Sequence, residues 1–217
     1  MSWRITPTQP IPAVIGEPFG GGYFAGYISH TADDNPTHAL IVAPRATGAT
    51  GTGYSLTTML SWKTTNTTTT GTGSDFNGAA NTAAMVTAGI ADHPAANFCV
   101  GLSIGGFSDW YLPARYELDI AYFNLKPTTS ANLTGGLNAY SVPARTLLYA
   151  ATYPAQTLVG AFNTSAESFV ASRHWSSVDW AASTAVDISF LDGAHRTGSG
   201  ATKVTPLCVR AFRRITL

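Results

Sequence analysis

Residues 105–126 read GGFSDWYLPARYELDIAYFNLK, and this stretch predicts a helix whose start follows from backbone chemistry. Pro113 suits the first helical position, because the N–H that proline lacks would have no partner there. An apolar stripe with the spacing i, i+3, i+4 and i+7 follows. The stripe consists of Leu118, Ala121, Tyr122 and Leu125. Lys126 and Pro127 then end the pattern, so we expect a helix of about three turns.

Two carboxylates fall in the N-terminal half of this expected helix. Glu117 and Asp119 lie where the positive end of the helix dipole stabilises negative charge. The segment before the helix, residues 109–112, reads DWYL and is expected to be buried. The sequence therefore places a polar helix start directly after an aromatic, core-facing segment.

The composition limits the functions that the chain can serve. Its 217 residues suffice for one well-cored domain with a short extension. Charged residues make up 11%, with 12 basic and 12 acidic side chains, which argues against an electrostatic nucleic-acid binder. No apolar run reaches the roughly 18 residues of a membrane span, and residues 1–4 do not resemble a signal peptide. A polar, uncharged surface is typical of chains packed into an assembly or exposed outside the cell.

Three arginines near the C-terminus are the densest basic cluster. Arg210, Arg213 and Arg214 lie in an alternating pattern that places Arg210 and Arg214 on one strand face. A phosphate track is one interpretation, but so few arginines are more typical of an ion-paired sheet edge. We therefore expect ion pairs here, and no nucleic-acid partner.

No pattern indicates a metal or a cofactor. Cys99 and Cys208 belong to no metal-binding spacing, and we expect two buried thiols rather than a disulfide. The histidines are scattered and are expected to be ordinary surface or core residues: His30, His38, His93, His174 and His195. Residues 101–105 match the letters G-x-S-x-G, but they follow an expected helix rather than a strand. We expect no catalytic, cofactor-binding or metal-binding residue, and no enzyme activity.

The chain organisation predicts an α+β protein. Residues 1–16 are proline-rich and are expected to form an extended arm, with one domain spanning residues 17–217. Strands are expected near residues 23–28, 38–43, 169–172, 174–176, 185–190 and 207–212, and helices over 78–89 and 94–100. The threonine-rich residues 64–73 are expected to be a solvated loop. Because strands, helices and strands follow one another without regular alternation, the class is α+β.

Three motifs in the second half resemble a known family. Residues 109–118 (DWYLPARYEL), 174–177 (HWSS) and 209–214 (VRAFRR) are similar to the patterns D-W-x-L-P-x-x-x-E-L, Y-W-S-S and V-R-x-V-R. These patterns are typical of a C-type-lectin-like domain family found in bacteriophage tail and fibre proteins and in bacterial surface proteins, long catalogued without a known function. The resemblance spans most of residues 20–214. It departs at His174, where Tyr is usual, and at Phe212, where Val is usual.

The resemblance implies a C-type-lectin-like fold, in which small antiparallel sheets are flanked by two or three helices and carry long loops. It implies that the motif residues maintain the fold rather than touch a ligand. These residues are Asp109, Trp110, Leu112, Pro113, Arg115, Glu117, Leu118, Trp175, Ser176, Trp180, Arg210 and Arg213. Trp110, Trp175 and Trp180 are expected in the core, and Asp109 or Glu117 is expected to pair with Arg115 or Arg210.

Two classes of protein related to this fold have known chemistry, and this chain lacks the residues that each class requires. Formylglycine-generating enzymes use paired cysteines in the C-terminal part, where this chain has only Cys208. Calcium-dependent lectins use acidic, proline and asparagine signatures in a late loop. The acidic residues 33–36 instead lie at an early hairpin tip, where a solvated turn is the simpler interpretation.

The resemblance implies a virion protein of the tail fibre or tail tip, assembled in the host cytoplasm and contributing to host attachment. Loops over residues 46–74, 127–145 and 191–204 are expected to form the contact surface, with Tyr140, Tyr149 and Tyr153 as candidate receptor contacts. The expected partners are other tail proteins, a glycan or protein receptor, and further copies of the chain, with a trimer expected from how fibres are commonly built. A purely structural tail or capsid subunit and a bacterial surface adhesin are the alternatives.

Overall fold

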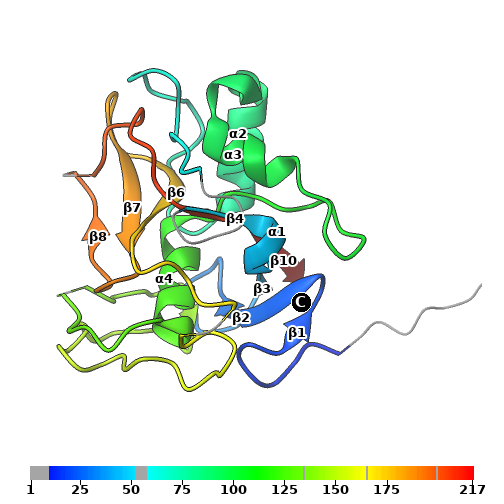
Figure 1. Ribbon diagram of the computed structural model, residues 1–217, viewed down its shortest axis with the longest axis vertical. Helices are drawn as coiled ribbons and strands as arrows, with labels where there is room; N and C mark the ends of the chain where they lie inside the picture. The colour runs from blue at the N-terminus through cyan, green and yellow to red at the C-terminus, as the bar shows by residue number, and fades with distance from the viewer. Residues whose placement is uncertain (1–9, 52–57, 134, 165, 199) are drawn as a thin grey trace, which may run out of the picture.

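A computed structural model describes residues 10–51, 58–133, 135–164, 166–198 and 200–217, which form a mixed α+β protein (Figure 1). The helical elements are α1 (Arg45–Gly48), α2 (Gly78–Gly89), the 3₁₀ turn η1 (Ile90–Asp92), α3 (Pro94–Val100) and α4 (Arg115–Leu125). The strands are β1 (Pro18–Phe19), β2 (Gly22–Ile28), β3 (His38–Val42), β4 (Ala49–Thr50), β5 (Ser141–Val142), β6 (Arg173–Asp179), β7 (Ala185–Ser189), β8 (His195–Arg196), β9 (Val209–Arg210) and β10 (Phe212–Thr216). The predicted α+β class and the helices over 78–89 and 94–100 are confirmed.

The strands form small antiparallel sheets. A five-stranded sheet has the order β1-β2-β3-β10 with β5 also paired to β2, a second sheet has the order β6-β7-β8, and β4 pairs with β9. Helix α4 packs against both β2 and β7, so it lies between the two larger sheets (Figure 1). Gly26 permits this close packing, because a Cβ there would lie 2.7 Å from Nδ2 of Asn124 on α4. The fold thereby places one face of α4 beneath the long loop that follows it.

Helix α4 begins two residues later than the sequence predicted. Ala114 is its N-cap, so Pro113 precedes the helix instead of occupying its first position. The carbonyl of Pro113 accepts a hydrogen bond of 2.7 Å from the Ser177 N–H, which ties this residue to β6 in an extended conformation. Glu117 accepts from the Ala114 N–H at 2.7 Å and so caps the helix. The predicted apolar stripe is buried throughout.

Three of the four tryptophans in the described residues lie in the core. Trp62, Trp110 and Trp175 are buried, and the indole N–H of Trp175 donates to the Leu60 carbonyl at 2.8 Å. Trp180 was expected in the core, and this expectation is wrong, because its side chain is 51% exposed. Trp180 follows the last residue of β6, in the turn toward Thr184, and this turn extends beyond the packed layers.

The prediction of which residues form ion pairs is also wrong, although most of the charged residues concerned pair with other partners. Asp109 pairs with Arg213, and Arg115 pairs with Asp75 at 3.3 Å. Arg210 pairs with Glu167 at 3.0 Å. Glu117 instead accepts a hydrogen bond from the Tyr111 hydroxyl at 2.9 Å. Two of the observed partners, Asp75 and Glu167, come from loops whose positions the motif spacing does not determine, and the third, Arg213, lies on β10.

The C-terminal arginines bind groups within the protein, as the sequence indicated. Arg210 and Arg213 form ion pairs, and Nη1 of Arg214 donates to the Asn77 side chain at 2.8 Å. The segment over 169–172 was expected to be a strand and is not one. Phe169 is buried there by ring stacking on Phe190, with the ring centres 4.1 Å apart, rather than by strand pairing. Cys99 and Cys208 are buried free thiols, as expected.

The threonine-rich loop is more buried than its composition suggested. Thr69 and Thr72 are buried, because two lysines insert their ammonium groups into the loop. Nζ of Lys63 donates to the carbonyls of residues 67 and 68 and to the Thr69 hydroxyl, at 3.0 to 3.3 Å. Nζ of Lys203 binds the Thr67 carbonyl at 2.9 Å and the Asp179 carboxylate at 2.7 Å. The prediction of a solvated loop is therefore wrong for the residues that face these lysines.

Candidate functional site

A buried carboxylate on α4 organises the loop that follows the helix. Asp119 is fully buried and lies beneath residues 135–150. Its oxygens accept hydrogen bonds from Nδ2 of Asn138 at 2.8 Å and from the Tyr149 hydroxyl at 2.6 Å. It also pairs with the Arg145 guanidinium and lies 2.9 Å from Nε2 of His195. These donors occupy all the acceptor sites that a carboxylate offers, so the role of Asp119 is to fix the loop.

The donors around Asp119 are themselves held in defined protonation states. Burial, together with the positive charges of Arg115 and Arg145, lowers the pKa of His195 to about 3. The ring is therefore neutral near pH 7, and because a carboxylate can only accept, His195 donates from Nε2. Burial also raises the pKa of Tyr149, which keeps its hydroxyl proton available for Asp119. The cluster is a stable arrangement of donors around one negative charge.

Close packing between Gly136 and Tyr149 completes the anchor. Gly136 has a φ of +91°, and a Cβ there would lie 2.3 Å from Cδ1 of Tyr149. Only glycine meets both conditions, because it tolerates the left-handed conformation and leaves room for the ring. The Arg145 side chain also donates from Nε to the Gly136 carbonyl at 3.2 Å. The loop is thus attached to α4 through both polar and steric contacts.

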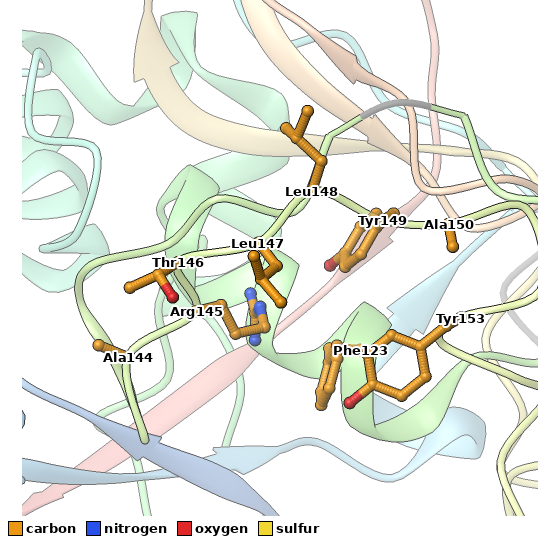
Figure 2. Close-up of a pocket in the computed structure, with 9 residues that line it drawn as sticks. All are labelled: Phe123, Ala144, Arg145, Thr146, Leu147, Leu148, Tyr149, Ala150 and Tyr153. Carbon is orange, nitrogen blue, oxygen red and sulfur yellow. The ribbon is translucent and has the colours of Figure 1, made fainter.

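The same helix face carries Phe123, one turn after Asp119, and this ring forms the floor of a groove. The Arg145 guanidinium lies 4.6 Å from the Phe123 ring centre, and Tyr153 meets the ring edge-on at 5.5 Å. Figure 2 shows Phe123 and Tyr153 together at one end, with Arg145 and Leu147 beside them. An open hollow of about 350 Å³ lies here. Its lining consists of Phe123, Ala144, Arg145, Thr146, Leu147, Leu148, Tyr149, Ala150 and Tyr153.

A second hollow joins the first. It has a volume of about 310 Å³ and shares Phe123, Ala144, Arg145 and Tyr153 with its neighbour. Its other walls are formed by Tyr27, Ile120 and Asn124 and by residues 141–143. We call the two hollows together the α4 groove. Its size and its mainly apolar, aromatic lining are typical of ligand-binding and peptide-binding sites.

The structure brings two of the three predicted receptor-contact tyrosines into the α4 groove. Tyr153 is 59% exposed and accessible, whereas Tyr149 is only 6% exposed and contributes one ring edge to the wall. Tyr140 lies elsewhere, stacked between Phe76 at 4.3 Å and Tyr116 at 5.3 Å. Tyr140 therefore packs within a half-buried aromatic stack, and its face is not free for a receptor.

Other residues of the groove were not predicted from the sequence. Phe123 and Asp119 are four positions apart on one helix, so helical spacing alone could have placed them on one face. The exposed Leu147 and Leu148 form an unusual apolar pair in a polar loop, which is a second available signal. None of the predicted fold-motif residues lines the α4 groove, although the structure describes all of them. Most of them are core or sheet residues, while Asp109 lies at the surface.

The remaining features bear on metal and membrane binding. In the part of the chain that the structure describes, no group of three His, Cys, Asp or Glu side chains is placed to hold a metal ion. Within these same ranges, no helix has the length and apolar character needed to cross a bilayer. Ser103, the central residue of the G-x-S-x-G match, is exposed shortly after the end of α3.

The fold and the groove define a mixed α+β protein with small antiparallel sheets and a loop-built apolar groove. Comparisons with protein-family models, with curated proteins and with solved structures find no match to the chain.

Proposed function

We propose that this protein is a non-enzymatic component of a bacteriophage tail fibre or tail tip that contributes to attachment to the host surface. The proposal rests on the resemblance of residues 109–118, 174–177 and 209–214 to C-type-lectin-like domains of tail proteins. Small antiparallel sheets around α4 are compatible with that fold. The chain is then a virion protein, assembled in the host cytoplasm, with other tail proteins as partners.

One observation carries the attachment role. The α4 groove opens on a loop whose backbone is fixed by Asp119 while its apolar residues face solvent. Leu147 is 80% exposed and Tyr153 is 59% exposed. Exposed apolar side chains on a fixed loop are costly for a free protein and typical of a recognition surface.

A cell-binding experiment tests this proposal. Fluorescently labelled protein is titrated onto a panel of bacterial strains, and bound fluorescence is measured by flow cytometry. We expect saturable binding to particular strains, and slower adsorption of phage to those strains in the presence of excess protein. Binding should fall in the Tyr153→Ala variant and be unchanged in Leu158→Asp, since Leu158 is exposed outside both the groove and the expected contact loops. Absence of saturable binding across the panel would favour a purely structural tail subunit.

A further inference from the structure

The segment Thr146–Leu148 has an unusual combination of properties at the rim of the α4 groove. It is anchored at both ends, since the Arg145 N–H donates to the Asn138 carbonyl at 3.0 Å and the Tyr149 N–H donates to the Gly135 carbonyl at 2.6 Å. Between these anchors, the N–H and C=O groups of the three residues have no hydrogen-bond partner among the described residues. They remain available to a partner outside the chain.

The charge of the groove restricts what can bind there. Arg145 is the charged residue among those that line the groove, and its guanidinium is committed to Asp119 and to the Gly136 carbonyl. A ligand carrying a net charge would therefore lose its hydration without gaining an ionic partner. An uncharged ligand suffers no such penalty.

The polar groups of the lining also distinguish between ligand classes. In the first hollow, the Tyr149 hydroxyl is used by Asp119, which leaves Thr146 and Tyr153 as side chains with free hydroxyls. The second hollow adds Tyr27, whereas its Asn124 and Ser141 already donate to backbone carbonyls of the protein. A saccharide presents many hydroxyls and needs more side-chain partners than these three residues offer. A polypeptide instead needs backbone partners for its own N–H and C=O groups and apolar pockets for its side chains.

We propose that the α4 groove binds an extended, uncharged polypeptide segment with apolar side chains, belonging to a protein on the host surface. The segment pairs its backbone with Thr146–Leu148 and places an apolar side chain on Phe123 and Tyr153. Unpaired backbone groups at an exposed edge recruit extended chains in this way. The inference deepens the proposed attachment role, on which it rests, by naming the chemistry of the receptor.

The first test uses synthetic peptides as the probe. An array of short uncharged peptides rich in Leu, Val and Phe is incubated with the full chain, beside matched peptides in which one apolar residue is replaced by Glu or Lys. Oligosaccharides of glucose and of N-acetylglucosamine form a parallel arm. We expect saturable binding to a subset of the uncharged peptides, and binding weaker by about tenfold or more for their charged counterparts.

Amino-acid substitutions and backbone amide NMR signals show where on the protein the peptide binds. Leu147→Asp should weaken peptide binding by about tenfold, because it introduces an unpaired charge at the rim. Leu158→Asp is the control of the same chemistry outside the groove and outside the expected contact loops, and it should bind peptide as the unchanged chain does. In ¹⁵N–¹H NMR spectra, peptide addition should shift the amide signals of Thr146, Leu147 and Leu148 more than those of the β6–β7 sheet.

The outcomes separate this inference from the proposed function. Oligosaccharide binding without peptide binding overturns the inference, and so does equal peptide binding by Leu147→Asp. Cell attachment that persists in Leu147→Asp overturns the polypeptide inference and leaves the attachment role standing. Peptide binding at Thr146–Leu148 without cell attachment supports the groove chemistry and contradicts the attachment role.

Discussion

Two long irregular segments of this protein, residues 64–77 and 127–153, are each organised by buried charge, but the charges have opposite sign. The earlier segment wraps its carbonyl oxygens around the ammonium groups of Lys63 and Lys203. The later segment directs its donors at the carboxylate of Asp119. In both cases a mostly irregular segment satisfies polar groups through one or two charged side chains, and among the described residues strand pairing is limited to the two residues of β5 in the later segment.

The two segments differ in what remains at the surface. The lysine-centred segment uses its backbone carbonyls internally and exposes mostly threonine hydroxyls. The segment around Asp119 is held through side chains, so part of its backbone and several leucines face solvent. Asp119 recruits side-chain donors and therefore leaves backbone groups free to bind a partner. The two lysines recruit backbone carbonyls, which are then not available to a partner.

The largest expected effect is at Asp119. Asp119→Ala leaves the Arg145 guanidinium buried without its partner, and we expect the free energy of unfolding to fall by about 4 to 5 kcal/mol. Urea denaturation followed by tryptophan fluorescence measures the change. The control is Asp109→Ala, because Asp109 is half-exposed in its pair with Arg213 and should cost about 1 kcal/mol or less. Equal losses in the two variants would contradict the central role of Asp119.

The next effect tests the lysine-centred segment. Lys203→Met leaves the Asp179 carboxylate almost buried and unpaired, so we expect a loss of about 3 to 4 kcal/mol in the same measurement. The double variant with Asp179→Leu removes both charges and should recover most of that stability. A double variant as unstable as Lys203→Met alone would show that the ion pair is not the source of the loss.

A further buried carboxyl group lies between α2 and α4, since Glu117 on α4 lies against Gly78 at the start of α2. Burial raises the pKa of Glu117 to about 7 from its ordinary 4.5. The folded state therefore holds this proton more tightly, and stability falls as the pH rises from 4.5 through 7. We expect the free energy of unfolding of Glu117→Gln to fall by about 2 to 3 kcal/mol less across that pH range than that of the unchanged chain. Unfolding curves collected across the range measure the difference. An unchanged pH profile in the variant would mean that other groups cause it.

The smallest expected effect is at Lys63, whose partners are neutral oxygens. Lys63→Met leaves two carbonyls and the Thr69 hydroxyl without this donor, and we expect a loss of about 1 to 2 kcal/mol. The difference from Lys203→Met isolates the contribution of the Asp179 charge. Equal losses of unfolding free energy in Lys63→Met and Lys203→Met would show that the ionic partner of Lys203 contributes no more than the neutral partners of Lys63.

Local patterns predicted α2, α3 and α4, because the causes of these helices are local, whereas α1 was not predicted. The stripe that begins at Leu118 has helical spacing, and all its members are buried in α4. The start of that helix was misplaced by two residues, because Pro113 is held by Ser177, which lies far away in sequence. The β2–β3 hairpin was likewise predictable, since its strands are adjacent in the chain.

The candidate site depends on contacts that no short pattern encodes. Asp119 was interpreted as a helix-dipole residue, but its donors come from positions 138, 145, 149 and 195. Trp175 and Trp180 are the same residue type in neighbouring positions, and only the course of the chain after β6 decides which is buried. The tyrosines were proposed from residue type alone, and that reasoning cannot distinguish the exposed Tyr153 from the stacked Tyr140.

The contact between Gly136 and Tyr149 has a consequence for how this surface can evolve. Substitution at either position would disturb the anchor, whereas Thr146, Leu147 and Leu148 carry side chains that the fold does not use for packing. The loop thus separates a frame in which packing restricts substitution from a short stretch whose side chains can change without disturbing the fold. Randomising that stretch is a direct route to new specificities, in nature by successive mutation and in the laboratory by library selection.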